Sequence, residues 1–576
     1  MKHSREYSIH GRSFLQASPK NSPSWLIENE PLIFWFMTIL FLVPIWFSNF
    51  LPTQDGPAHL YNAHLLKNFL TGIPNDVVSG FYELNTNPTP TWFLHIILTG
   101  LQFFFSPSVA EKLVVTILIL SLPAAARFAV GKIDQTMKPL AWLAFPMTYS
   151  LLFYHGFYGM CFSVPCFLFT FGAVLDYLRT GSSYSLFLIT VGSLLCYVMH
   201  IIGLGLLGLA VVVLGIGWAL MIWQNNVTIL WGFVTSRLIP LGMTFLPALL
   251  LMVLFLGEKQ SVLKSEFDLS HLFSRGQNLG LSGSLFSIIF TGPAALLSVG
   301  TIFSLLLFLL LAGMLRGRHL KLGMTRIMFA IFLLFCLLQL FLPQLFLVTP
   351  NNGMMGGGFI SQRIALFITP VFILFLATCS NSINYFFNQF RIVLFFTVFI
   401  LCFHSISIYH FNGYLKEYIA FGRHIQPDTL FMPLHFFPEE KLTIRGPLGI
   451  ALRWRFDPLV HASNHIAMET GALSLDNYEP SMGYFPLLYR NDMNPETIGY
   501  VDCRLRSLYG DRPTVFKNLI THYKEKGFPV KYVLVWRMAD AGLSEDLAMV
   551  LADSSTLIAE SRHGQLYQIN GETAVK

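Results

Sequence analysis

Charged residues are scarce in this sequence: Asp, Glu, Lys and Arg make up only 12% of its 576 residues, whereas 54% are hydrophobic. A soluble domain carries about 25% charged residues, so this chain has too few to cover a surface in water. The mean hydropathy of +0.58 agrees with this. Lipid must therefore surround most of the chain, and the lipid bilayer is its first expected partner.

Several kinds of functional pattern are also missing. The net charge of +6 is spread along the chain without a basic stripe carrying interleaved aromatics, which excludes nucleic acid as a partner. The seven cysteines show neither CxxC nor Cys/His zinc spacing. Only Cys503 lies in the polar C-terminal region, so a disulfide within that region is excluded.

Long apolar runs are what the chain does have. Residues 1–31 form a polar tail, and the run 32–51 that follows is too long for a signal peptide and is expected to be a retained first span. We predict about eleven membrane-spanning helices. They lie at 32–51, 110–127, 139–153, 158–178, 184–199, 201–223, 236–256, 294–314, 325–343, 362–379 and 392–409. The stretch 91–105 is too short to cross a bilayer and is predicted to be interfacial or re-entrant.

The distribution of cations predicts the orientation, because Lys and Arg in short loops favour the cytoplasmic side. With the N-terminal tail in the cytoplasm, the cytoplasmic segments receive most of them: Lys2, Arg5, Arg12, Lys20, Arg127, Lys132, Lys138, Arg179, Arg316, Arg318, Lys321, Arg326 and Arg391. The first long loop, 52–109, and the region 411–576 then lie together on the outer face. The expected location is the plasma (inner) membrane of a bacterium.

The region 411–576 changes in composition and is predicted to be a small soluble α/β domain. A helix over 514–526, a strand over 530–536 and a hairpin over 557–569 are expected in it. His461 and His465 are four residues apart, a spacing that suits a metal on one helix face, although core or surface histidines are favoured. Aromatic residues and an arginine over 478–490 fit either a sugar or lipid acceptor or a face packed on the membrane.

The first outer loop carries the most chemical pattern. Pro57 suits the first turn of a helix capped by Asp55 or Gly56, and an apolar stripe follows at Ala58, Tyr61, Leu65 and Phe69. This predicts a helix lying on the membrane surface, with Asp55 at its positive end and His59 one turn away. The plain alternative is that Asp55 only caps the helix.

Other outward ends of spans carry polar groups that are expensive at that depth unless they are paired or functional. Arg363 follows the glycine-rich loop 351–358 and is suited to hold a phosphate at headgroup level, with snorkelling as the alternative. His200 is its expected partner. Further candidates on the outer face are His64, His155 and Tyr158, and for the histidines a satisfied interfacial residue is the more common case.

This arrangement resembles the GT-C class of membrane glycosyltransferases, the superfamily of mannosyl- and arabinosyltransferase-like enzymes. The likeness rests on the first span, the membrane-proximal Asp55, the surface helix, the step Asn87-Pro88-Thr89-Pro90, the many further spans and the outer C-terminal domain. It implies a GT-C-like transmembrane domain over 32–410 and a polyprenyl-phosphate-linked sugar as donor. The acceptor would be an extracytoplasmic glycolipid, glycan or protein.

The resemblance also implies roles for individual residues. Asp55 would act as general base or bind the metal or acceptor, with His59 as its partner or alternative base. Arg363 and His200 would neutralise the departing phosphate, and attack from the opposite face predicts inversion. We therefore expect Asp55, His200 and Arg363 to converge on one outward cavity.

The chain departs from the class in one respect. Many members place a second acid in the next outer loop, where this chain has Tyr154-His155-Gly156. Asp76 and Glu83 in the first loop are candidates for that second carboxylate, although such residues are more often plain loop charges. A divalent cation, Mg²⁺ or Mn²⁺, is the expected cofactor if the site binds a metal, but metal dependence stays open.

Two other readings remain. A secondary transporter predicts internal repeats, which the sequence does not show, and charges at mid-span, which are scarce. A non-catalytic lipid-binding or assembly protein would explain the missing second carboxylate.

Overall fold

The computed structural model describes twelve parts of the chain: residues 24–72, 74–87, 89–224, 227–258, 322–342, 360–379, 382–436, 443–445, 451–453, 458–500, 513–537 and 545–570. The expected span 294–314, the glycine-rich loop 351–358, Cys503 and most of the N-terminal tail lie outside these residues. Six cysteines are described, and all six are free thiols.

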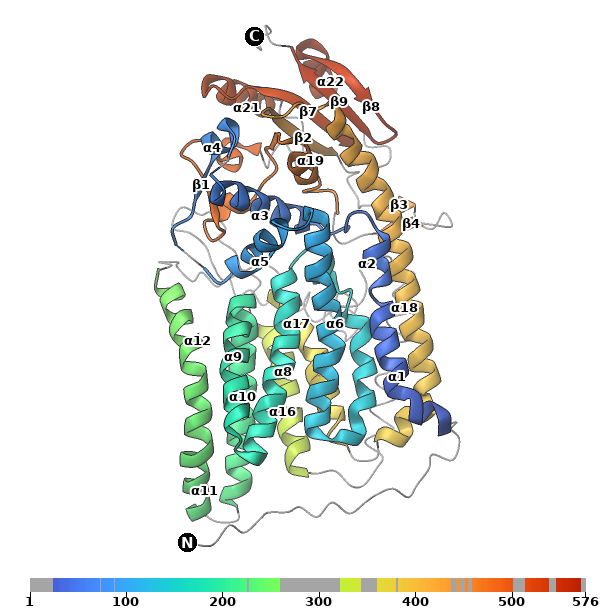
Figure 1. Cartoon of the computed structure of the whole chain (residues 1–576), viewed down its shortest axis with the longest axis vertical. Coiled ribbons are helices and arrows are strands. Elements are labelled where there is room, and N and C mark those ends of the chain that lie inside the picture. The colour runs from blue at the N-terminus through green and yellow to red at the C-terminus, as the bar shows by residue number, and fades with distance from the viewer. Residues whose placement is uncertain are drawn as a thin grey trace.

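A bundle of long apolar helices forms the larger part of the molecule (Figure 1). Seven helical runs of the described residues are long and apolar enough to cross a membrane: Glu28–Phe47, Pro107–Ile133, Tyr158–Thr180, Ile201–Trp223, Thr228–Phe255, Gly323–Phe341 and Gln389–His424. The first belongs to α1 (Ser24–Leu40) and α2 (Val43–Phe47), and the next three are α6 (Pro107–Ile133), α8 (Tyr158–Thr180) and α10 (Ile201–Trp223). The fifth runs from α11 (Val227–Phe233) through η2 (Val234–Leu238) to α12 (Ile239–Glu258). The last two belong to α16 (Leu322–Phe341) and to α18 (Ser382–Ile419) with η3 (Ala420–His424). The shorter helices α9 (Ser183–Met199) and α17 (Ile360–Leu376) pack among them. The protein is an integral membrane protein with many spans, as predicted.

The expected span 139–153 has a different form. It is a 3₁₀-helix, η1 (Gln135–Met147), followed by the short helix α7 (Leu151–Tyr154), and it packs along α6. Two prolines, Pro139 and Pro146, lie inside η1. A 3₁₀-helix rises about 2.0 Å per residue against about 1.5 Å in an α-helix, so a short run can extend further along the bundle. The apolar pattern was right and the expected helix type was wrong.

The first loop lies across one end of the bundle. Its helix α3 (Gly56–Leu70) runs beside α5 (Trp92–Gln102), and both lie between the spans and the C-terminal domain (Figure 1). The apolar stripe of α3 is buried at Ala58, Tyr61 and Leu65. The helix at 91–105 is confirmed as too short to span a membrane.

The C-terminal domain is built on a five-stranded mixed sheet of order β5-β2-β7-β9-β8. Its strands are β2 (Leu430–Phe436), β5 (Leu473–Ser474), β7 (Val530–Arg537), β8 (Ser555–Glu560) and β9 (Gly564–Ile569). The expected helix, strand and hairpin appear as α21 (Pro513–Glu525), β7 and the antiparallel pair β8–β9. Other described elements of the domain are α19 (Ser463–Thr470), α22 (Glu545–Ser554), η5 (Glu479–Met482), η6 (Pro495–Ile498) and the pair β3 (Thr443–Arg445) and β4 (Ala451–Arg453). The helix α18 runs past the expected boundary at 410 and carries the chain into this domain.

The first loop and the C-terminal domain are joined by backbone pairing. After α4 (Asp76–Phe81), the strand β1 (Tyr82–Leu84) pairs antiparallel with β6 (Leu487–Tyr489). The side chain of Asn62 donates to Asn477 at 2.8 Å, and Thr91 donates to the Tyr484 carbonyl at 2.6 Å. These contacts place residues more than 350 positions apart at one boundary.

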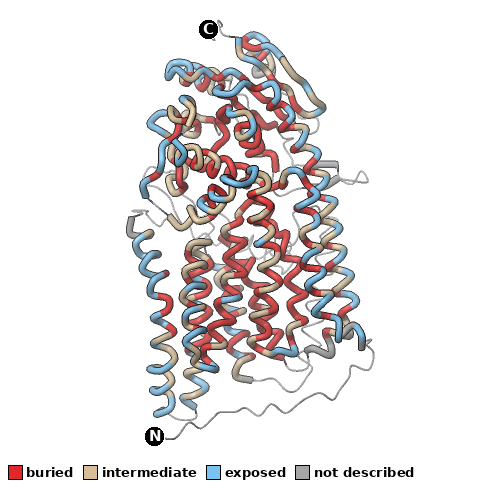
Figure 2. Tube along the Cα trace, viewed as in Figure 1, coloured by how far each residue is buried: buried red, intermediate tan, exposed pale blue. Residues whose placement is uncertain are grey.

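Buried residues lie inside the bundle and the C-terminal domain, and exposed residues lie on the perimeter (Figure 2). The interior of the bundle and the central sheet are buried, whereas large apolar side chains on the bundle perimeter are exposed, such as Phe47 at 84% and Leu250 at 61%. Exposed apolar side chains of this kind on long helices face lipid.

A buried ion pair lies near the start of α1, toward the end of the bundle away from the sheet. Arg127 donates from both terminal nitrogens to Glu30, each at 2.8 Å, and Trp142 donates to the same carboxylate at 2.9 Å. Both charged side chains are buried. Removing one member of such a pair leaves the other charge buried and unpaired.

We therefore expect Glu30→Ala to lower the free energy of unfolding by about 3–5 kcal/mol. The midpoint of thermal unfolding of the purified protein in detergent measures this. Asp492→Asn, which removes the exposed ion-pair partner of Lys526 and suits the positive φ of this position, is the control and should change the midpoint little. Equal midpoints for wild type and Glu30→Ala would contradict the assigned role of the pair.

Candidate functional site

Asp55 precedes α3, but its side chain does not cap the helix. One carboxylate oxygen accepts a hydrogen bond from the Tyr478 hydroxyl at 3.2 Å, and the other lies 3.4 Å from the Gln54 side-chain nitrogen. The side chain is buried although it lies in a loop. Simple capping therefore does not explain why an acid stands at this position.

A second acid holds the histidine that faces Asp55. His461 Nε2 lies 3.9 Å from Asp55 Oδ1, and His461 Nδ1 contacts the buried Asp476 at 3.2 Å. The His461 ring also packs on Tyr478, with ring centroids 4.8 Å apart. Asp55 thus belongs to a polar cluster whose other members, His461, Asp476 and Tyr478, come from the C-terminal domain.

The pKa of Asp55 is raised above its ordinary value of 3.8. Burial is the largest cause, because it penalises the charged form. His461, His59 and the hydrogen bond from Tyr478 act in the opposite direction without cancelling it. The carboxyl group is therefore a better proton acceptor than an exposed aspartate.

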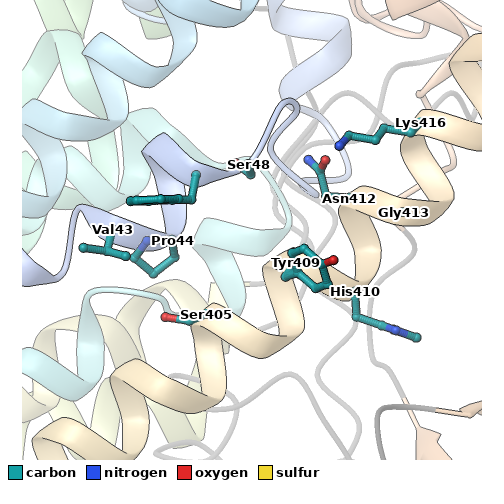
Figure 3. Close-up of a pocket in the computed structure, with 10 residues that line it drawn as sticks. Val43, Pro44, Ser48, Ser405, Tyr409, His410, Asn412, Gly413 and Lys416 are labelled. Atoms are coloured by element: carbon teal, nitrogen blue, oxygen red, sulfur yellow. The ribbon is translucent and has the colours of Figure 1, made fainter.

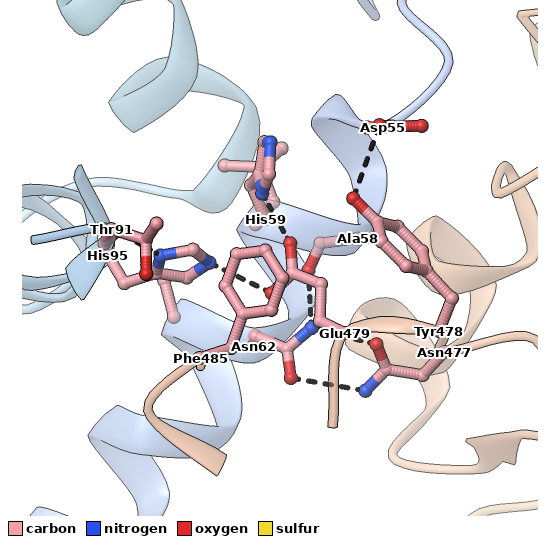
Figure 4. Close-up of polar contacts among 12 residues, drawn as sticks. Asp55, Ala58, His59, Asn62, Thr91, His95, Asn477, Tyr478, Glu479 and Phe485 are labelled. Atoms are coloured by element: carbon pink, nitrogen blue, oxygen red, sulfur yellow. Dashed lines mark hydrogen bonds and ion pairs between the residues drawn. The ribbon is translucent and has the colours of Figure 1, made fainter. Parts of the chain in front are cut away.

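One turn into α3, His59 joins a second cluster (Figure 4). His59 Nδ1 makes a close contact with one oxygen of Glu479, and His95 Nε2 lies 2.9 Å from the other oxygen. Burial raises the pKa of Glu479, but the two histidines outweigh it and lower that pKa to about 2. Burial likewise lowers the pKa of His59, but Glu479 outweighs it, so that this pKa is raised.

Arg363 approaches the same region from α17. Its Nη1 donates to His200 Nε2 at 2.7 Å, and its guanidinium lies 4.9 Å from the centre of the Phe157 ring. The Nε of Arg363 is buried and has no hydrogen-bond acceptor among the described residues. No described carboxylate forms an ion pair with Arg363, so its charge lacks a direct counterion there.

These groups surround one cavity of about 140 Å³ at the boundary between the bundle, the first loop and the C-terminal domain. Its polar and aromatic lining comes from His59, His95, Phe157, Tyr158, His200, Arg363, Tyr478, Tyr484 and Phe485. Of the expected convergent set, His200 and Arg363 line the cavity, and Asp55 lies one hydrogen bond behind its wall, at Tyr478.

Tyr158 introduces a carboxylate that the sequence analysis did not single out. Its hydroxyl donates to Glu111 of α6 (Pro107–Ile133) at 2.6 Å and lies 3.0 Å from the Thr53 hydroxyl. Gly56 fits beside them because a Cβ atom at that position would lie 2.6 Å from Glu111 Oε1. Thr53, Gly56 and Glu111 thus fix the start of α3 against α6 and α8 (Tyr158–Thr180).

Gly156 lets the first loop approach the turn before α8. The backbone N–H of Asp55 donates to the His155 carbonyl at 3.1 Å. Gly156 has φ +82°, and a Cβ atom there would lie 2.6 Å from the Gly56 nitrogen. Only glycine fits this conformation and this approach.

The remaining sequence candidates lie elsewhere. Asp76 and Glu83 are exposed, and neither lines the cavity. His64 points toward Gln102, and burial, with a smaller effect of Lys67, lowers its pKa to about 4. His155 stacks on Phe157, and burial and then Arg363 lower its pKa to about 4. His465 packs on Phe50 and does not share a cluster with His461.

Two larger cavities exist among the described residues. One, of about 530 Å³, lies between α2 and α18 (Figure 3), and the other, of about 770 Å³, is lined by Glu30, Arg127 and Lys138. Neither is lined by a predicted site residue. We therefore assign the candidate site to the smaller cavity, where the titratable groups converge.

Comparisons with known proteins give a similarity at the level of structure. No protein-family model and no curated protein matches the sequence. Among solved structures, the chain is similar to ArnT from Cupriavidus metallidurans, in a crystal structure bound to undecaprenyl phosphate. The TM-score is 0.47 with 10% sequence identity, over 94% of this chain and 98% of that one.

Proposed function

We propose that the protein is an integral membrane glycosyltransferase of the GT-C type. It would transfer a sugar from a polyprenyl-phosphate donor to an acceptor outside the cytoplasm, with inversion. The observation that carries this proposal is the half-buried Arg363, which lines the cavity with a buried Nε that has no acceptor and without an ion-pair partner among the described residues. A cation for a phosphate therefore lines the cavity, and a carboxylate for a proton lies one hydrogen bond behind its wall.

Arg363 is suited to the leaving phosphate. A neutral imidazole has one lone-pair nitrogen, yet His200 faces two donors, Arg363 and the backbone N–H of Ile202. It accepts fully from only one of them, so the bond from Arg363 is readily exchanged. A phosphate is a stronger acceptor and would take Nη1 and Nη2 in a bidentate contact, with the free Nε as a further donor.

Asp55 is suited to the acceptor hydroxyl. Burial raises its pKa, which favours uptake of a proton at neutral pH. Tyr478 and His461 hold the carboxylate from the domain side. An acceptor hydroxyl activated by Asp55 would attack from the face opposite the leaving phosphate, which would give the proposed inversion.

The positions of two cations at the ends of spans support the proposed orientation and location of the protein in the membrane. Lys132 and Arg179 lie in the last turns of α6 and α8, at the ends that point away from the C-terminal sheet (Figure 1). Cations favour the cytoplasmic side, so the cavity and the C-terminal domain would lie outside the cytoplasm in a bacterial plasma membrane.

Binding of a polyprenyl phosphate tests the donor side. We expect undecaprenyl phosphate to bind the purified protein, and Arg363→Ala to weaken binding by about 10- to 100-fold, because hydrogen bonds to charged groups contribute about 1.5–3 kcal/mol. Native mass spectrometry in detergent measures the bound lipid. Arg423→Ala, at an exposed arginine, is the control. If the wild-type protein is folded but does not bind the lipid, the proposed function fails.

The pH dependence of transfer tests the base. Because the pKa of Asp55 is raised, its ionised form is lost at a higher pH than that of an exposed aspartate. Activity should therefore fall on acidification at a pH above 3.8, and Asp55→Glu should shift that acid limb. Initial rates in proteoliposomes across pH measure it. An acid limb unaffected by Asp55→Glu would argue against Asp55 as the base.

A further inference from the structure

Two imidazoles and one carboxylate meet at the wall of the cavity. His59 of α3, His95 of α5 and Glu479 of η5 are all buried, and their possible ligand atoms all lie within 4.8 Å of one another. Asp55 is not among them. The two imidazole rings contact different oxygens of the same carboxylate.

The hydrogen bonds of His59 fix how its nitrogens are used. Nε2 lies 3.1 Å from the Gly156 carbonyl, which can only accept, so Nε2 must carry the proton. A neutral His59 then presents the bare lone pair of Nδ1 to the Glu479 oxygen. Two acceptors in contact repel each other unless a cation lies between them.

His95 shows the same arrangement with its nitrogens exchanged. Nδ1 lies 3.3 Å from the Thr91 carbonyl and donates to it. Nε2, the nitrogen left without a proton in the neutral ring, lies 2.9 Å from the second oxygen of Glu479. Both histidines thus use one nitrogen on a backbone carbonyl and turn the other to the same carboxylate, the usual state of histidines that ligate a metal.

We propose that His59, His95 and Glu479 bind one divalent transition-metal ion, of the Zn²⁺ or Mn²⁺ class. Two nitrogens and one carboxylate oxygen suit these ions, whereas Mg²⁺ prefers oxygen ligands in an octahedron. Three protein ligands leave a further coordination position, and the cavity lined by His59 and His95 gives it access to a ligand. The alternative that the test must separate is a pair of imidazolium ions.

The site would also join two parts of the chain. His59 and His95 belong to the first loop, and Glu479 belongs to the C-terminal domain. The ion would therefore hold the domain against the loop at the cavity, next to the carboxylate of Asp55. Its role in transfer rests on the proposed function, whereas its presence is tested by metal content alone.

The experiment measures metal in the purified full-length protein. The protein is supplied with ZnSO₄ or MnCl₂ in separate samples, freed of unbound ion and analysed by inductively coupled plasma mass spectrometry. We expect about one ion per chain in the wild type and less than about a tenth of that in Glu479→Gln and His95→Gln. His64→Gln, a histidine of α3 outside the cluster, is the matched control and should keep the ion.

A second measurement, made on the wild type, keeps the test valid even if the ligand variants fail to fold. X-ray absorption on the metal-loaded wild type should show two imidazole nitrogens, at about 2.0–2.1 Å for Zn²⁺. A folded wild type that retains neither ion, as the imidazolium pair predicts, overturns the proposal, as does a bound ion without imidazole ligands. Neither result bears on undecaprenyl phosphate binding, so the metal site and the proposed function can fail separately.

Discussion

Asp55→Asn is expected to reduce sugar transfer by about 10²–10⁴-fold, the usual contribution of a general base. Asparagine keeps the shape and can still accept from the Tyr478 hydroxyl, but it cannot take a proton. Binding of the donor lipid should be unchanged, because the phosphate is assigned to Arg363. Initial rates in proteoliposomes and lipid binding by the same preparation separate the two effects.

Asp76→Asn is the matched control for this prediction. Asp76 is an acid of the same outer loop, but it is exposed, whereas Asp55 is buried and bonded to Tyr478 of the cavity wall. We expect its replacement to leave transfer within about twofold of wild type, since surface substitutions are usually nearly neutral. Equal transfer rates for wild type and Asp55→Asn would remove Asp55 from the mechanism.

Arg363→Ala is expected to reduce the rate of transfer from bound donor by about 10²–10³-fold, the cost of removing one donor that stabilises developing charge. Arg363→Lys keeps the charge but loses the fork of donors, so its transfer rate should lie between those of the wild type and Arg363→Ala. Single-turnover rates at saturating donor separate this effect from weaker binding. Arg391→Ala, at the far end of α18 from the C-terminal domain, controls for a general effect of losing a cation.

A reduction equal to that of Arg391→Ala would contradict the role given to Arg363. Recovery by lysine to the wild-type rate would show that charge alone is needed and that the bidentate contact is not. If Arg363→Ala slows transfer at low donor concentration but not at saturating donor, Arg363 acts in donor binding only.

Much of the fold could be predicted from local pattern. Apolar runs marked the spans, and the short run at 91–105 was correctly separated from them because length alone excludes a crossing. The helix after Asp55 followed from Pro57 and the apolar stripe. The form of residues 135–147 could not be predicted, because residues 139–147 are all buried and no exposed face reveals the period of the helix.

Some residues of the candidate site could likewise be predicted from the sequence, and others could not. Asp55, His200 and Arg363 stood out because each interrupts apolar sequence next to a span. Glu479 and His95 did not, because each is an ordinary residue in its own segment and acquires its neighbours only through tertiary contacts. His461 was noted for its spacing to His465, whereas the structure places it beside Asp55. The second carboxylate was sought locally at Asp76 and Glu83, whereas Glu479 comes from the C-terminal domain. The adjacent Tyr478 was noted for its aromatic ring and not for the acid beside it.

A structure of the protein with bound undecaprenyl phosphate tests the central claim most directly. The account predicts that the phosphate lies in the cavity between the bundle and the C-terminal domain, within about 2.7–2.9 Å of Arg363 nitrogens, with the prenyl chain leading into the bilayer. Arg363 would then have left His200. A phosphate bound away from this cavity, with the contact between Arg363 and His200 intact, would contradict the account.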